Sequence, residues 1–190
     1  MQQVLLPEIR IRWTPENQNP AIIGPLTSVN YEFDAGVSVS DQDLIKTSVQ
    51  GIIDVWENNA GFDVNSLRVY ASPDVEHLVN TAVTVLGLYN SSYHPTFGET
   101  MANQIREDLI NTSDSVPGPG VVLFNTEGAT WQQKSQYETD ITDQIMHATG
   151  HAIHDLVAKR KIDEYLDIAA WLREGVVNLM ALWGTEKTIN

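Results

Sequence analysis

Residues 146–155 read MHATGHAIHD and contain three of the five histidines in the chain. Side chains four positions apart on a helix lie on one face, one turn from each other. His147 and His151 can therefore present two imidazole nitrogens to one metal ion, at the roughly 2.0–2.1 Å that zinc prefers. His154 lies three positions further on, near the same face. A pair of this spacing is common by chance, so it predicts a metal-binding helix only in combination with a third ligand.

Residues 170–177 read AWLREGVV and place Glu174 23 positions after His151. His-x-x-x-His followed by Trp-Leu-x-Glu-Gly resembles the gluzincin metallopeptidases, which are thermolysin-like in plan, and is most similar to their small peptidase-MA-like domains. The resemblance implies a Zn²⁺ ion held by His147, His151 and Glu174, and it spans about residues 29–185. It also implies that Gly175 permits a close approach between the two helices.

Ala148 is the departure from this pattern. The family motif is His-Glu-x-x-His, and its glutamate is the general base that takes a proton from the attacking water. A methyl group cannot carry a proton, and general acid–base catalysis contributes on the order of 10²–10⁴-fold. We therefore expect the chain in this form to be inactive or nearly so. An engineered Glu-to-Ala inactivation and a natural pseudo-enzyme both explain Ala148, and the sequence does not decide between them.

Three further residues are candidates for roles around the metal. Asn178 follows Glu174 by one turn and could accept the outer N–H of His147. His154 could contact substrate or support a ligand, and Tyr165 could stabilise the oxyanion of a tetrahedral intermediate. A plain structural role in the core or on the surface is the alternative for each of them.

The remaining sequence predicts strands and helices with no regular βαβ alternation. Alternating or compact apolar runs predict strands at Glu8–Trp13, Val29–Phe33, Leu67–Ala71 and Val121–Phe124, the first two as an antiparallel pair. Capping residues and helical periodicity predict helices near 40–58, 73–88, 96–110, 135–159 and 165–183, with capping boxes at Thr96/Glu99 and Ser135/Glu138. Residues 113–120, SDSVPGPG, read as a loop.

These elements predict a single α+β domain over residues 1–190. By the resemblance, the fold is zincin-like, with a mixed twisted sheet over the metal-binding helix and a short helical C-terminal part. In that family the edge strand of the sheet binds an extended peptide substrate by β-augmentation. We expect this edge to be formed by Val121, Val122, Leu123 and Phe124.

The amino-acid composition and charge of the chain limit which partners and metal ligands it can have. The chain has 190 residues, of which 42% are hydrophobic, enough for one globular core. Its 25 acidic and 11 basic residues give a net charge of −14, which disfavours nucleic acid. It has no cysteine, so any metal must bind histidine and carboxylate. No apolar stretch is long enough for membrane insertion, and no signal peptide is evident, although an extracellular or cell-envelope location is slightly favoured.

The sequence thus favours a zinc-dependent metallopeptidase domain that lacks its general base, acting on a peptide or protein substrate. Further domains of a longer natural chain are compatible with this interpretation. A zinc-binding pseudo-peptidase that serves as a peptide- or protein-binding module is the alternative. In a third interpretation, the domain is structural and the histidine cluster is a coincidence.

Overall fold

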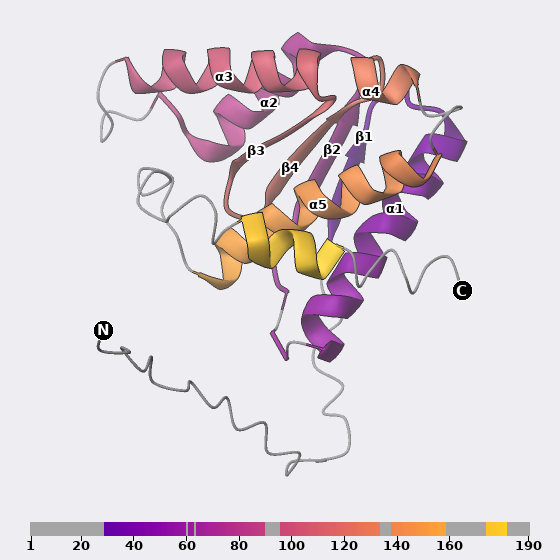
Figure 1. The fold of residues 1–190 in the computed structure, drawn as a ribbon. Helices are drawn as coiled ribbons and strands as arrows, with labels where there is room; N and C mark the ends of the chain where they lie inside the picture. Colours follow the sequence, from indigo (N-terminus) through magenta and orange to yellow (C-terminus); the bar gives the residue numbers. More distant parts are fainter. Residues whose placement is uncertain are drawn as a thin grey trace, which may run out of the picture.

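The computed structural model describes residues 29–59, 61–62, 64–89, 96–133, 138–158 and 174–181. Within them, the chain forms a four-stranded mixed sheet between helices (Figure 1), which confirms the α+β prediction. The strand expected at Glu8–Trp13 lies outside the described residues. The same is true of Ser135 and of most of the last expected helix.

The sheet has the strand order β1-β2-β4-β3. Its strands are β1 (Asn30–Phe33), β2 (Arg68–Ser72), β3 (Asp114–Gly118) and β4 (Val121–Asn125). The first, second and fourth run parallel, with Val69 opposite Val122, whereas β3 runs antiparallel to β4. A helix separates β1 from β2 in the chain, as a parallel crossover requires, so the structure contains a βαβ unit that the sequence analysis did not predict.

The expectation that residues 121–124 form the sheet edge is wrong, because β4 lies between β2 and β3. All five β4 residues are buried, and a continuous apolar run is typical of a strand covered on both faces. The edge is β3, in the stretch that the sequence analysis took for a loop. Pro117 favoured a loop because proline is excluded from central strands. It is tolerated at an edge strand such as β3. The pairing is irregular between Ser115 and Gly118, and Gly120, at φ +69°, makes the turn into β4.

Two long helices cover one face of the sheet (Figure 1). They are α1 (Val39–Asp54), which continues into the π-helical turn η1 (Val55–Asn59), and α5 (Glu138–Val157). Ser38, rather than the expected Ser40, caps α1, and its hydroxyl accepts a hydrogen bond from the Asp41 backbone N–H. Apolar side chains from both helices and the sheet form the larger core, which includes Ile52, Val122 and Ile145.

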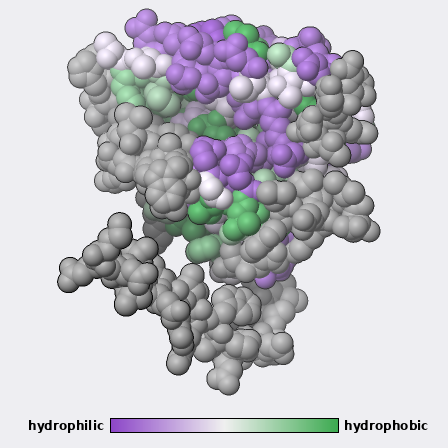
Figure 2. All heavy atoms as spheres, in the orientation of Figure 1, coloured by the Kyte–Doolittle hydropathy of each residue, from purple (hydrophilic) through white to green (hydrophobic). Residues whose placement is uncertain are grey.

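The opposite face is covered by α2 (Val75–Leu86) and α3 (Phe97–Asn111), and the outer surface over α3 is largely hydrophilic in Figure 2. Asp74 caps α2, and Gly87, in the left-handed conformation, ends it. Thr96 begins α3 but its side chain makes no capping bond, so the predicted capping box is not formed there. A short helix, α4 (Ala129–Gln132), was not predicted. None of the described helices is long and apolar enough to cross a membrane.

Candidate metal centre

Helix α5 places His147 and His151 one turn apart on the same face, as their spacing predicted. The two rings meet edge to face with centroids 4.5 Å apart, and their Nε2 atoms are 3.0 Å apart. Two nitrogen lone pairs at this distance repel each other unless a proton or a cation lies between them. The arrangement therefore fits either an N–H···N hydrogen bond between the two rings or a metal ion bound by both of them.

Glu174 completes the group from the C-terminal helical segment (residues 174–181), which lies beside α5 in Figure 1. Its Oε1 is 3.3 Å from Nε2 of His151, and its Oε2 is 3.5 Å from Nε2 of His147. Ligand atoms about 2.0–2.1 Å from a tetrahedral zinc ion are about 3.3 Å from one another. The separations are close to this spacing, with 3.0 Å between the two Nε2 atoms and 3.3 and 3.5 Å from them to the two different Glu174 oxygens.

The three ligand candidates differ in their access to solvent. The side chain of His151 is 8% exposed, that of His147 31% and that of Glu174 47%. His151 is thus anchored in the protein, and the other two border an open side. Three protein ligands with an open fourth position are typical of catalytic rather than structural zinc sites.

Gly150 lets the two helices approach closely at this site. A Cβ atom on Gly150 would lie 3.0 Å from Cγ1 of Val177, a buried residue of the C-terminal helical segment. The expectation that Gly175 has this role is wrong, because a Cβ atom on Gly175 would meet no described residue within 4 Å. The contact between Gly150 and Val177 positions the segment that carries Glu174.

We expect Gly150→Ala to weaken zinc binding by about tenfold, because the added methyl group pushes Val177, and Glu174 with it, away from α5. Competition titration against a chromophoric zinc chelator measures this change. Gly175→Ala is the matched control and should bind as the parent does. Val177→Ala in the Gly150→Ala background should restore affinity. Parent-like affinity in Gly150→Ala alone would contradict this role of Gly150.

Ala148 points into the protein rather than toward the three ligand atoms. It is 1% exposed and belongs to the core between α5 and α1. One residue advances a helix by about 100°, which accounts for this placement beside the face that carries His147. The alanine fills its position without a polar group, and it offers nothing that could transfer a proton.

Of the other candidate residues, the two that the structure describes, His154 and Asn178, do not join the metal group. His154 packs near Trp56, with ring centroids 6.3 Å apart, and its Nδ1 is 3.4 Å from a carboxylate oxygen of the buried Asp155. Asn178 is exposed, and no hydrogen bond joins it to His147 among the described side chains. Tyr165 lies outside the described residues.

Gln144 and Asp114 lie near the metal centre, and neither was predicted to be a functional residue. The side-chain amide of Gln144 donates hydrogen bonds to the Thr112 carbonyl and to Oδ1 of Asp114, which joins α5 to the edge strand β3. Burial raises the pKa of the Asp114 carboxyl, while the hydrogen bonds from Gln144 and Thr112 and the charge of His147 act in the opposite direction. Gln144 precedes His147 by three positions, so helical spacing was the available signal.

No family model, curated protein or solved structure matches this chain.

Proposed function

We propose that this chain is a zinc-dependent metallopeptidase domain of gluzincin type, in a form that lacks its general base. The observation that carries the proposal is the triangle formed by Nε2 of His147, Nε2 of His151 and the Glu174 carboxylate. These three residues would hold the ion. Zinc, when bound in such a site, supplies Lewis-acid polarisation of a carbonyl oxygen and lowers the pKa of water.

The sheet supports the proposal by its position relative to the ligands. Helix α5 packs against β3 and β4, and β3 is the antiparallel edge of a mixed sheet. This plan agrees with the zincin-like fold that the resemblance implies. No other described strand pairs with the outer side of β3.

An extended peptide could therefore pair with β3 through main-chain hydrogen bonds, close to the side of the centre where Gln144 joins α5 to the strand. The substrate-binding edge is thus Asp114–Gly118 in the revised proposal. Main-chain pairing orients the peptide bond with little dependence on sequence, while side-chain contacts supply specificity.

Ala148 favours a second candidate function. With no proton carrier at position 148, the same centre and the same sheet edge would bind a peptide without cutting it. The domain would then be a zinc-binding pseudo-peptidase that recruits a partner protein. Restoring a carboxylate at position 148 distinguishes the two functions.

Zinc removal tests the centre that both functions share. A ligand present at 100 times its dissociation constant stabilises the native state by about 2.7 kcal/mol. For a chain of this size, that corresponds to a melting temperature higher by about 5–10 °C. We expect differential scanning calorimetry to show this loss in excess EDTA and its recovery on adding zinc. An unchanged melting temperature, once metal analysis shows that zinc has left, would count against a zinc site formed in the native protein.

A further inference from the structure

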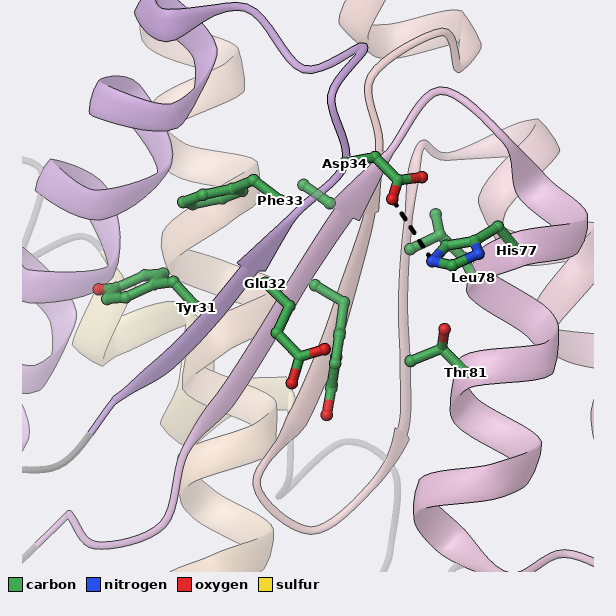
Figure 3. Close-up of a pocket in the computed structure, with 9 residues that line it drawn as sticks. Tyr31, Glu32, Phe33, Asp34, His77, Leu78 and Thr81 are labelled. Carbon is green, nitrogen blue, oxygen red and sulfur yellow. Dashed lines mark ion pairs between the residues drawn. The ribbon is translucent and has the colours of Figure 1, made fainter.

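A groove of about 400 Å³ lies at the opposite edge of the sheet from β3, between β1 and α2 (Figure 3). Glu32 and Asp34 of β1 face His77 and Thr81 of α2 across it. A second hollow of about 340 Å³ continues the groove along α2, past Glu32 and His77. The first hollow is lined by residues 31–34 along β1, which makes this part of the groove suited to an extended chain.

The outer edge of β1 has backbone groups available for pairing. The N–H groups of Asn30 and Asp34 donate to the carbonyls of Leu67, just before β2, and of Ala71 in β2. Alternate residues of a strand direct their backbone groups to opposite sides. The backbone groups of Tyr31 and Phe33 therefore point to the outer edge, where no described strand pairs with β1.

The two faces of β1 have different chemistry. Glu32 and Asp34 extend toward α2, whereas Tyr31 and Phe33 extend to the other side, as Figure 3 shows. The two aromatic rings stack with centroids 5.7 Å apart and pack against the larger core. A strand added beside β1 would place its alternate side chains next to the acidic residues on one face and next to the aromatic residues on the other. It should therefore alternate basic and apolar residues.

The groove is acidic, and no described lysine or arginine forms an ion pair with Glu32 or Asp34. Glu32 accepts a hydrogen bond from the side-chain amide of Asn30. Asp34 accepts one from the Ser72 hydroxyl and lies 3.5 Å from Nε2 of His77. Burial and the charge of Glu32 raise the pKa of Tyr70, whereas the charge of Arg68 and its hydrogen bond act to lower it. Cationic side chains would neutralise this negative potential.

We infer that the groove is the docking site for Glu8–Trp13 of this same chain, added antiparallel to β1 with Arg10 and Arg12 over Glu32 and Asp34. Residues 9–13 read IRIRW, which is the required alternation, with Ile9, Ile11 and Trp13 on the apolar side, while Glu8 at the end of the segment is on the same side as the arginines. They lie outside the described residues, so this inference rests on their sequence and on the groove. Tethering to β1 gives the segment an effective concentration in the millimolar range.

A charge-reversal cycle in the full chain tests the docking. Arg10→Glu/Arg12→Glu and Glu32→Arg/Asp34→Arg should each lower the melting temperature by roughly 2–6 °C, since each places like charges opposite one another. The combined variant restores opposite charges and should recover much of both losses. Glu99→Arg/Glu107→Arg, on exposed positions of α3, is the matched control and should give no recovery with the arginine reversal.

Two outcomes would overturn the inference. One is a combined variant whose melting temperature falls by the sum of the two separate decreases. The other is a recovery of the melting temperature that appears only in samples in which size-exclusion chromatography shows dimers. The segment would then dock on a second copy of the chain.

Cysteine pairs give an independent measure of proximity in a chain that has no native cysteine. An antiparallel pairing with Arg10 and Arg12 over Glu32 and Asp34 places Arg12 opposite Glu32 and Arg10 opposite Asp34. Arg12→Cys/Glu32→Cys should therefore form an intramolecular disulfide on mild oxidation, visible as a gel shift. Glu99→Cys in place of Glu32→Cys is the control. Failure of Arg12→Cys/Glu32→Cys to cross-link would also refute the docking.

Discussion

His151→Ala protein is expected to be purified with less than about 0.1 zinc ion per chain, whereas the parent chain should carry one. His151 is the most buried of the three ligand candidates, and its Nε2 lies within 3.3 Å of ligand atoms of both His147 and Glu174. Its removal leaves two ligands on the open side, too few for a catalytic zinc site. Mass spectrometry of the intact native protein, or elemental analysis, measures the metal content.

His77→Ala is the control for this prediction, because it removes an exposed histidine at the other edge of the sheet. It should leave the zinc content at one per chain. Glu174→Gln should retain some zinc with weaker affinity, since an amide oxygen is a poorer ligand than a carboxylate. If the His151→Ala protein still bound one zinc ion per chain, the assignment of the ligands would be wrong.

Local sequence patterns predicted the parts of this fold that depend on local interactions. The i, i+4 apolar spacing predicted α1, and β-branched apolar runs predicted β2 and β4 to within about a residue. The same periodicity placed His147 and His151 on one face of α5. Helix geometry alone fixes that relation, so it needed no knowledge of the tertiary structure.

The order of the strands was not predictable in the same way. The apolar run of β4 is equally consistent with any buried strand, and only the pairing with β2 and β3 shows that it is central. Two prolines and two glycines make residues 113–120 resemble a loop. Pairing with β4 on one side is enough to hold them as a strand. An edge strand needs half as many backbone hydrogen bonds as a central one, so its sequence signal is weak.

Helix packing also decided which glycine matters at the candidate site. Gly150 and Gly175 are both helical, and nothing in their flanking sequence tells them apart. Only the path of the C-terminal helical segment brings Val177 against Gly150. The position of Glu174 relative to the two histidines thus depends on a contact between residues that are distant in sequence.

Ala148→Glu should gain peptide-bond hydrolysis of about 10²-fold or more over the parent chain, if the centre acts as proposed. A glutamate at this position is one residue beyond His147 and is long enough to extend from the helix toward the open side of the ligand triangle. There its carboxylate could take a proton from an attacking water. Because Ala148 is 1% exposed, a carboxylate that stayed in the core would instead lower the melting temperature. Cleavage of a denatured protein mixture, followed by mass spectrometry of the fragments, measures the gain.

Ala148→Gln is the matched control, because it has nearly the shape of glutamate but cannot accept the proton. It should bind zinc and remain as inactive as the parent. Chelators, hydroxamates and the added His151→Ala substitution should each abolish the activity of the Ala148→Glu protein, since all three act at the metal. Cleavage by a contaminating protease would persist when His151→Ala is added to Ala148→Glu. The double variant therefore shows whether the cleavage comes from this protein. An Ala148→Glu protein that folds and binds one zinc ion but cleaves nothing would replace the peptidase proposal with the pseudo-peptidase one, because the metal and the base would both be present without catalysis.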